Sequence, residues 1–170
     1  MATDRPYHHG NLRQAVLAAA VDAITEVGPA GVSLRDLARR AGVSHAAPAH
    51  HFGDKAGLLT ALAAEGYGLL ADALDAAHRR TQDFLEVGVA YVRFAVGHRA
   101  HFEVMFRPDL YRSDDREVLA ARERASNALS GGIDTLPSGR AGTDARISLK
   151  GVRAGSTKLS IFALRQQDIV

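Results

Sequence analysis

The chain has 170 residues, of which 46% are hydrophobic and 24% are charged, values that are ordinary for a soluble globular protein. It contains no cysteine, which excludes disulfide bonds and thiolate metal sites and fits a reducing, cytoplasmic location. We expect no signal peptide and no membrane-spanning segment, because no apolar run approaches the roughly 18 residues that a bilayer requires.

Charge is unevenly distributed along the chain, whose net charge is +2. Residues 1–60 carry six Lys or Arg, five Asp or Glu and five of the eight His, whereas residues 61–138 carry nine basic and twelve acidic residues. Residues 139–170 carry six basic residues and two acidic ones. The excess of basic residues therefore lies at the C-terminal end, so it is not evidence that the N-terminal part binds nucleic acid.

Residues 11–28 are predicted to form the first helix. Asn11 is a suitable N-cap, and apolar residues follow at the spacing of one helical face. Gly28 followed by Pro29 is typical of a helix end. We expect this helix to pack behind the segment that follows it.

Residues 33–55 carry the most informative pattern, which predicts two short helices joined by a tight turn. Ser33 and Asp36 have the spacing of a capping box, and Gly42 can adopt the left-handed conformation that ends a helix. Ser44 is placed to cap the second helix. This arrangement is typical of a helix-turn-helix, whose second helix enters the major groove of DNA. An ordinary helical hairpin is the alternative.

The second of these helices favours DNA binding over a plain hairpin. It carries small and polar residues where a core helix would carry Leu or Ile, with Phe52 as a single apolar anchor. Small side chains allow close approach to base edges, and Ser, His and Lys can donate hydrogen bonds to phosphates. The predicted contact residues are Ser44, His45, Ala46, Ala47, His50, His51 and Lys55.

A long helix is predicted from a cap at Asp54 to about His78. Gly66 and Gly68 weaken its middle by roughly 1 kcal/mol each relative to Ala. Such a helix could connect two domains and transmit a tilt between them. Alternatively, the glycines could simply let another helix pack closely.

Three further segments follow. Phe84–Val96 is apolar nearly all round, which predicts a helix inside a core. A shorter apolar segment, Phe102–Phe106, comes next. A charged amphipathic helix is predicted to begin at Asp114 or Asp115 and to end at residues 131–132. The apolar anchors expected on it are Val118, Leu119 and Leu129.

Aromatic side chains and a methionine between residues 91 and 106 could line an apolar ligand pocket, or they could simply form a core. Tyr91 is the best pocket candidate, because its hydroxyl needs a hydrogen-bond partner. The candidate pocket residues are Tyr91, Phe94, Phe102, Met105 and Phe106.

No metal site, cofactor or catalytic constellation is predicted. His98 and His101 are three residues apart with Glu103 nearby, but a zinc site needs three or four ligands, so a chance pair explains them better. The chain has no glycine-rich phosphate loop, no nucleophile elbow and no zinc-protease motif. We therefore expect a protein that is not an enzyme.

The first third of the chain resembles the DNA-binding domain of the TetR (tetracycline-repressor-like) transcriptional regulators. The resemblance runs from Tyr7–Arg13 to Leu59, with the caps, the turn, Phe52 and Lys55 in register. A weaker resemblance, to the central helices of the regulatory domain, continues through Tyr91–Phe94 and residues 101–106. It implies an all-α protein: a three-helix helix-turn-helix domain (residues 1–56) joined by a long helix to a helical ligand-binding domain (residues 57–136).

The resemblance also implies roles for individual residues. Arg35 matches a position that contacts bases from the edge of the groove, and residues 44–47 match the base-facing start of the recognition helix. His51 and Lys55 match phosphate-contacting positions. The tyrosine that is usual in the family is replaced by Ala49, which removes one phosphate contact, and Pro48 predicts an irregular first turn.

Residues 137–170 depart from the family pattern. The family has two long apolar helices there, which form the dimer interface, whereas this segment has no sustained helical stripe. A divergent tail, a truncation and a shifted reading frame all remain open. The resemblance implies a ligand-responsive repressor that binds a near-palindromic operator as a homodimer, with an unknown small-molecule effector. The alternative is a helix-turn-helix module with impaired dimerisation that binds DNA weakly and non-specifically.

Overall fold

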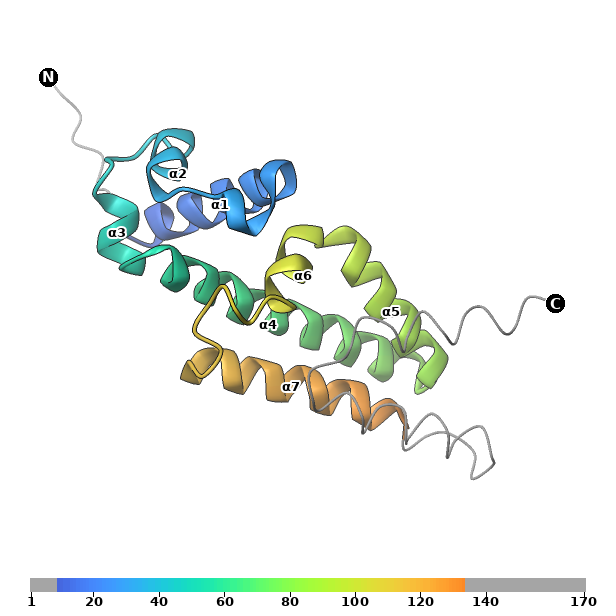
Figure 1. Cartoon of the computed structure of the whole chain (residues 1–170). Coiled ribbons are helices and arrows are strands. Elements are labelled where there is room, and N and C mark those ends of the chain that lie inside the picture. The colour runs from blue at the N-terminus through green and yellow to red at the C-terminus, as the bar shows by residue number, and fades with distance from the viewer. Residues whose placement is uncertain (1–8, 134–170) are drawn as a thin grey trace, which may run out of the picture.

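The computed structural model describes residues 9–133, which form seven α-helices and contain no strand (Figure 1). The all-α prediction is confirmed for this part of the chain. The segment predicted to be an atypical tail lies outside the described residues. The helices are α1 (His9–Gly31), α2 (Leu34–Arg40), α3 (Ala47–Phe52), α4 (Lys55–Thr81), α5 (Phe84–Gly97), α6 (Arg99–Met105) and α7 (Arg116–Ile133).

The long helix α4 runs through the middle of the molecule and contacts every neighbouring layer (Figure 1). The three N-terminal helices gather at its beginning. Helices α5 and α6 pack on one side of it, and α7 lies along the other side. Helix α6 also contacts α1, so the N-terminal and central parts touch each other directly as well as through α4.

Two groups of buried apolar side chains hold these layers together. The first joins α1, α2 and α3 to the first half of α4, and it also includes Ala100 and Val104 of α6, Tyr111 of the following loop and Val118 of α7. The second lies between the second half of α4 and helices α5, α6 and α7. The first group therefore extends across the domain boundary that we expected at residue 56.

Helix α1 begins at His9, two residues before the predicted cap at Asn11. Gly28 has a left-handed backbone (φ 73°), which breaks the helix immediately before Pro29, as predicted. The apolar residues of α1 that face the core include Val16, Leu17 and Ile24, which are almost completely buried. This face packs against the helix-turn-helix segment, as the sequence indicated.

Helix α4 begins as predicted, because the Asp54 carboxylate accepts a hydrogen bond from the Gly57 amide at 2.7 Å. It continues to Thr81, three residues beyond the expected end. Gly66 is buried, and a Cβ there would lie 2.7 Å from the Met105 sulfur, so the close packing of α6 depends on this glycine. A Cβ at Gly68 would meet nothing within 4 Å, so this glycine is not required for packing.

By length and composition, α4 is the one helix of residues 9–133 that could cross a membrane, contrary to our expectation of no such run. More than half of its most apolar 18-residue window is buried inside the protein. A central helix in a helical core meets the same criteria, so the finding is weak evidence for a membrane span.

The prediction that α5 is a core helix is correct for only one of its faces, which contributes Val87 and Phe94 to the second core. Only Val87 and Phe94 are buried, whereas Leu85, Val92 and Val96 are 71%, 45% and 78% exposed. Helix α5 lies on the outside of α4 and α6, so one of its two apolar faces has no neighbouring element within the described chain.

Helix α7 begins where the sequence predicted. The Asp115 carboxylate accepts a hydrogen bond from the Glu117 amide at 2.9 Å, which identifies Asp115 as the capping residue. Val118 is completely buried and Leu129 packs against the second core. Leu119, which was also expected to be an anchor, is instead 41% exposed, because it follows Val118 by about 100° around the helix.

Candidate nucleic-acid interface

Helix α2 begins at the predicted place but not with the predicted cap. Ser33 has the extended backbone of an N-cap (φ −125°, ψ 133°), yet its side chain makes no capping hydrogen bond. The Asp36 carboxylate accepts hydrogen bonds from Arg39 and Arg40, at 2.5 and 2.6 Å. The predicted capping box is therefore not formed, because the guanidinium groups of Arg39 and Arg40 bind the Asp36 carboxylate.

The turn after α2 is built as the sequence predicted. Gly42 has a left-handed backbone (φ 65°), and the Val43 amide donates to the Ala38 carbonyl at 3.0 Å. Val43 then packs against the first core. The direction of the chain between the two helices is thus fixed by one glycine and one apolar contact.

Helix α3 begins at Ala47, with Ala46 at the cap position, so the predicted cap at Ser44 is wrong. The Ser44 carbonyl accepts a hydrogen bond from the Ala47 amide at 3.0 Å, which makes a turn ahead of the helix. The reason is Pro48: it lacks an N–H group and is tolerated only in the first turn, so the helix must begin just before it.

Two buried residues fix α3 to the rest of the molecule. Phe52 is only 8% exposed, and the guanidinium of Arg13 from α1 lies 5.8 Å from the centre of its ring. Pro48 is buried on the same side of the helix. Ala47 is half-buried and packs against the first core. These contacts turn the opposite side of α3 towards solvent.

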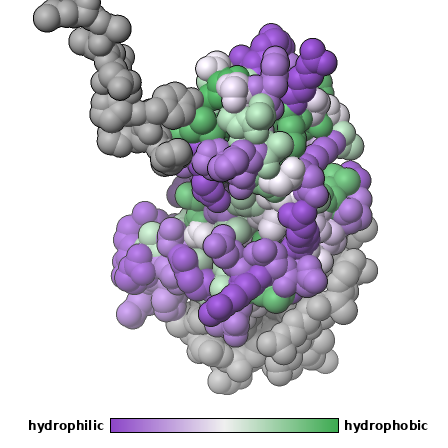
Figure 2. Space-filling view, turned by 90° about the vertical axis from the view of Figure 1, so that its left-hand side faces the viewer, coloured by the Kyte–Doolittle hydropathy of each residue, from purple (hydrophilic) through white to green (hydrophobic). Residues whose placement is uncertain are grey.

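The remaining predicted contact residues of this segment lie at the surface. Ser44, His45, Ala46 and His50 are exposed, and His51 is half-buried beside Phe52. Figure 2 looks at this end of the molecule, where hydrophilic residues (purple) are interspersed with smaller hydrophobic patches (green). The segment thus presents small and polar side chains to solvent.

The three arginines of α2 differ in their surroundings. Arg35 is exposed and has no ion-pair partner among residues 9–133. Arg39 is paired with Asp36. Arg40 is paired with Asp36 and also donates hydrogen bonds to both carboxylate oxygens of Glu26, with N–O distances of 2.7 and 2.9 Å. Of these three arginines, only Arg35 forms no ion pair with a carboxylate of residues 9–133.

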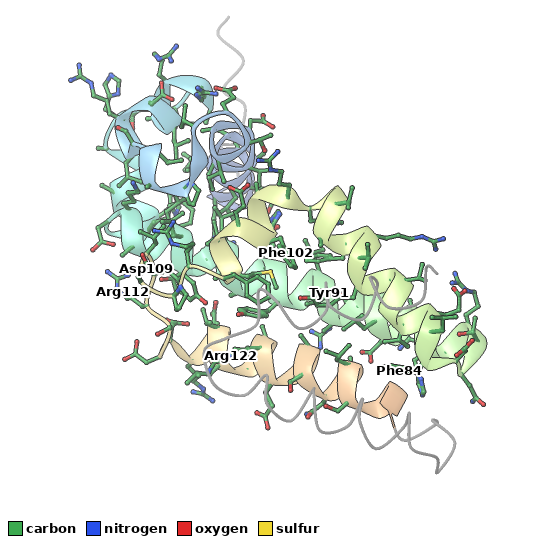
Figure 3. The ribbon with its side chains drawn as sticks, turned by 45° about the vertical axis from the view of Figure 1, so that its right-hand side comes forward. Phe84, Tyr91, Phe102, Asp109, Arg112 and Arg122 are labelled. Atoms are coloured by element: carbon green, nitrogen blue, oxygen red, sulfur yellow. The ribbon has the colours of Figure 1, made fainter. Side chains whose placement is uncertain are left out.

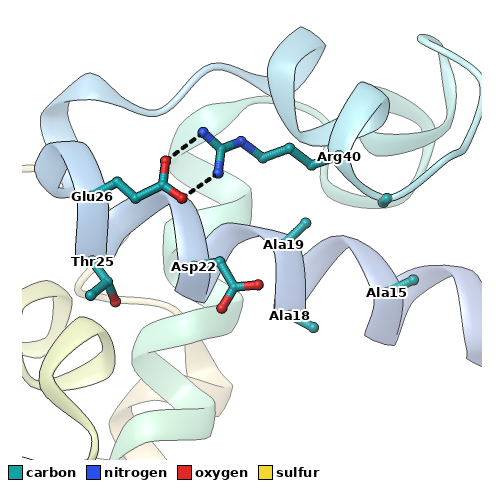
Figure 4. A pocket seen from close by; sticks show the side chains of 8 residues that line it. Ala15, Ala18, Ala19, Asp22, Thr25, Glu26 and Arg40 are labelled. Atoms are coloured by element: carbon teal, nitrogen blue, oxygen red, sulfur yellow. Dashed lines mark hydrogen bonds and ion pairs between the residues drawn. The ribbon is translucent and has the colours of Figure 1, made fainter.

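The Arg40 cluster ties α2 to α1 beside a shallow surface pocket (Figure 4). Hydrogen bonds from Arg40 lower the pKa of Glu26, and those from Arg39 and Arg40 lower the pKa of Asp36. Both guanidinium groups are held by carboxylates of the same cluster, so it is best explained as a structural link between the two helices. The pocket is lined by Ala15, Ala18, Ala19, Asp22, Thr25, Glu26, Arg40 and Ala41.

Lys55 has a structural contact that the sequence did not indicate. Its ammonium donates a hydrogen bond to the carbonyl oxygen of Ala30 at 2.5 Å, which connects the start of α4 to the end of α1. An ammonium has three donors, so this bond leaves two for another acceptor. Lys55 is half-buried and lies just after the exposed segment of α3.

Arg112, in the loop between α6 and α7, joins the central part of the protein to the start of α4. Its guanidinium is 2.8 Å from the Asp54 carboxylate, and its backbone amide donates to the Thr60 hydroxyl at 3.0 Å. Sequence reasoning missed this residue. Arg112 and Asp54 are 58 positions apart, and no local pattern links them.

The five predicted ligand-pocket residues come together, but as a packed cluster. The rings of Tyr91 and Phe102 meet edge to face with centres 5.9 Å apart, and those of Phe102 and Phe106 are 4.6 Å apart. Phe94 and Met105 are buried, and the other three are half-buried. Burial raises the pKa of Tyr91. Figure 3 shows Tyr91 and Phe102 close together, while Phe84 lies at the far end of α5.

The residues considered for a metal site do not converge. The His98 ring stacks on Phe94 at 4.7 Å, and Glu103 is paired with Arg99 at 2.9 Å. His101 is buried, with Nε2 3.6 Å from Glu65, and burial lowers the pKa of its imidazole. Within residues 9–133, no group of three possible ligands comes together.

A glycine turn between two short helices, packed on the start of a long central helix, forms a helix-turn-helix, the unit with which many transcriptional regulators bind DNA. Residues 16–62 match the family model for bacterial regulatory proteins of the tetR family. The chain belongs to the tetR family, whose members are transcription factors.

Solved structures share this fold. A protein of unknown function from Rhodococcus sp. RHA1 is 33% identical, over 88% of this chain and 84% of that chain, with a TM-score of 0.69. The TetR family transcriptional regulator PfmR from Thermus thermophilus is 24% identical, over 81% and 82%, with a TM-score of 0.55. The multidrug binding protein EbrR, complexed with imidazole, is 19% identical, over 96% and 93%, with a TM-score of 0.55. The last two show a shared fold. No curated protein matches the chain.

Proposed function

We propose that this protein is a ligand-responsive repressor that binds a near-palindromic operator as a homodimer in the bacterial cytoplasm. The observation that carries the proposal is the exposed face of residues 44–51, held outwards by the Gly42 turn and the buried Phe52 anchor. A helix-turn-helix presents such a face to the major groove, and a two-fold dimer presents two of them to two half-sites.

The side chains of this face have roles that suit their chemistry, as do Arg35 on α2 and Lys55 at the start of α4. Arg35 reads a base edge, because its guanidinium is exposed and can form two parallel hydrogen bonds to guanine. Ser44, His45 and Ala46 approach the bases, since they are small or polar and precede the first turn of α3. Ala47 supports the helix from inside. His50, His51 and Lys55 donate to phosphates.

The effector is an apolar small molecule that enters the aromatic cluster of α5 and α6. The cluster combines ring faces with the hydroxyl of Tyr91, which is the composition of a pocket that binds drug-like ligands. The shared fold with EbrR, a multidrug binding protein, supports a ligand of this type. A ligand acts by binding one arrangement of the helices more tightly than the other. The Arg112–Asp54 contact offers a route from the loop after α6 to the start of α4.

The second candidate is a helix-turn-helix module that dimerises poorly and binds DNA weakly and non-specifically. The observation that favours it is the exposed apolar face of α5, because a regulatory domain assembled as a tight dimer would cover such surface. The two candidates differ in specificity, which separates them by experiment.

The test is to select a preferred duplex from random DNA and to compare its binding with that of a scrambled duplex at several salt concentrations. Arg35→Ala should reduce the preference for the selected duplex by about 1–3 kcal/mol if Arg35 contacts guanine. Arg39→Ala is the matched control, because the Arg39 guanidinium is engaged by Asp36 on the same helix. Equal losses in both variants, or failure to select any sequence, would contradict the proposal and favour the second candidate.

A further inference from the structure

The segment that faces DNA in the proposed function carries most of its basic character on histidine. Residues 44–55 contain three histidines, one lysine and one aspartate. The charges of Lys55 and Asp54 cancel, so the net charge of this segment is 0 with neutral histidines and +3 with all three protonated. Histidine is the side chain whose ordinary pKa, about 6.5, lets its charge change between about pH 5 and pH 8. The charge that the segment offers to phosphates therefore depends on pH.

Two of these histidines form a pair at the end of α3. His50 is exposed, and His51 is half-buried beside the Phe52 ring. The rings of His50 and His51 meet edge to face, with centres 5.5 Å apart. A neutral imidazole has one N–H donor and one acceptor nitrogen, whereas a protonated imidazole has two donors and a positive charge. Protonation therefore makes this pair a stronger ligand for the phosphate oxygens of a DNA strand.

The surroundings of the pair supply cations but no unpaired carboxylate. Helices α1, α2 and α4 pack against α3. The charged groups that they and the cap of α4 carry at this end of the molecule are Arg13, Arg35, Asp36, Arg39, Arg40, Asp54 and Lys55. Both carboxylates are already paired with arginines, and no carboxylate of residues 9–133 lies within ion-pair distance of His50 or His51. The phosphates of a bound duplex are therefore the anions that can stabilise the protonated imidazoles in this part of the chain.

We propose that DNA binding by this protein is coupled to proton uptake by His50 and His51, so that its affinity for DNA rises as the pH falls from about 8 to about 6. The proposal rests on the proposed function, because it adds a regulation to the same DNA-binding face. The phosphates keep their negative charge over this range, so the change comes from the protein. Each proton taken up on binding lowers the dissociation constant by up to about tenfold per pH unit.

The first test is binding of a DNA duplex by the full chain between about pH 6 and about pH 8 at constant ionic strength. A duplex of arbitrary sequence is suitable, because phosphate contacts do not depend on base sequence. The dissociation constant of the wild type should fall by about tenfold or more over this range. The double variant His50→Gln, His51→Gln keeps side chains that donate hydrogen bonds but cannot be protonated near neutral pH, so most of this change should be lost.

His98→Gln is the matched control. It removes an exposed histidine outside the DNA-binding face, so the full pH dependence of binding should remain. His45→Gln separates the pair from the histidine that precedes α3 and should remove less of the pH dependence than the double variant does. Circular dichroism at each pH shows that every variant remains folded.

Calorimetry counts the protons directly. Titrations of DNA at about pH 7, in two buffers with different ionisation enthalpies, should show the uptake of about one proton or more per bound chain. The double variant should take up fewer. The salt dependence of wild-type binding should also steepen as the pH falls, by about one counterion for each imidazole that becomes charged. The salt dependence of the double variant should stay nearly constant.

Either of two results overturns the proposal while leaving the proposed function intact. One is a DNA affinity that does not change between about pH 8 and about pH 6. The other is a pH dependence that the double variant retains in full, which would assign the proton to another group. In both cases the preference for a selected duplex, and its loss in Arg35→Ala, still test the proposed function. A chain that binds no duplex at any pH would contradict both proposals.

Discussion

Helices α3 and α5 make opposite use of the protein surface. Helix α3 has six residues, is held by Phe52 and Pro48, and presents small and polar side chains outwards. Helix α5 has 14 residues, is held by Val87 and Phe94, and presents aliphatic side chains outwards. In both helices, two buried side chains are enough to fix the orientation. The side chains on the exposed face then determine what each helix can bind.

The anchor of α3 should give the largest effect on stability. Phe52→Ala removes a ring that is 8% exposed in the first core, so we expect the free energy of unfolding to fall by about 3–5 kcal/mol. Urea unfolding followed by circular dichroism measures this loss. Val92→Ala on the free face of α5 is the comparison and should change stability by no more than about 0.5 kcal/mol. Similar losses would show that the outer face of α5 is covered.

The two central glycines of α4 allow a matched test of the packing beneath α5 and α6. Gly68→Ala should stabilise the protein by about 0.5–1 kcal/mol, because the position is helical and open. Gly66→Ala should be less stable than Gly68→Ala by about 1–3 kcal/mol, because its methyl group meets Met105 and His101. Equal melting temperatures would mean that α6 can move away at little cost.

The turn that positions α3 should depend on a single glycine. Gly42→Val forces a β-branched residue into a left-handed backbone (φ 65°), which costs at least about 1 kcal/mol. The loss should appear in thermal unfolding and in weaker DNA binding. Gly88→Val on α5 is the comparison, because that position is helical and open and its φ is not left-handed. An unchanged melting temperature for Gly42→Val would contradict the role of this turn.

Lys55 tests the edge of the DNA-binding face. Lys55→Ala should weaken all DNA sequences alike and reduce the salt dependence of binding by about one counterion. It also removes the hydrogen bond to Ala30, so its unfolding should be measured in parallel. A loss of affinity with an unchanged salt dependence would assign Lys55 a purely structural role.

The smallest effect should come from the ion pairs within α2 and between α2 and α1. The folded pKa values of Glu26 and Asp36 lie below their ordinary values of 4.5 and 3.8, because Arg39 and Arg40 donate to their charged forms. Their contribution to stability is therefore complete above pH 4.5 and is lost as the pH falls through the lowered folded values. Melting temperatures measured from about pH 6 to about pH 2 should fall less steeply for Arg40→Met than for the wild type. Parallel curves would show that the cluster adds nothing.

Local sequence signals predicted most of the architecture. Gly28, Gly42, Asp54 and Asp115 mark helix ends as expected, because each acts through its own backbone or a neighbouring amide. The start of α3 was predicted too early in the chain. Proline is tolerated only in the first turn of a helix, so Pro48 places the start at Ala47, even though Ser44 is a residue type that often caps helices.

The remaining features depend on contacts between distant segments. The pairs Glu26–Arg40, Lys55–Ala30 and Asp54–Arg112 join residues 14, 25 and 58 positions apart, so no local pattern contains them. The extent to which α5 is buried was overestimated for a related reason. An apolar helix is buried only as far as other elements reach it, and the number of neighbours is a property of the fold rather than of the helix.

The buried apolar group around α1 limits how this protein could be taken apart. Ala100, Val104, Tyr111 and Val118 complete it, although they lie more than 40 positions beyond the start of α4. A fragment ending near residue 56 would expose the side chains that these residues cover and would lose the salt bridge at Asp54. A transplant of the helix-turn-helix onto another regulatory domain would therefore need to include α6, the following loop and the start of α7, or to replace the apolar side chains that these segments cover.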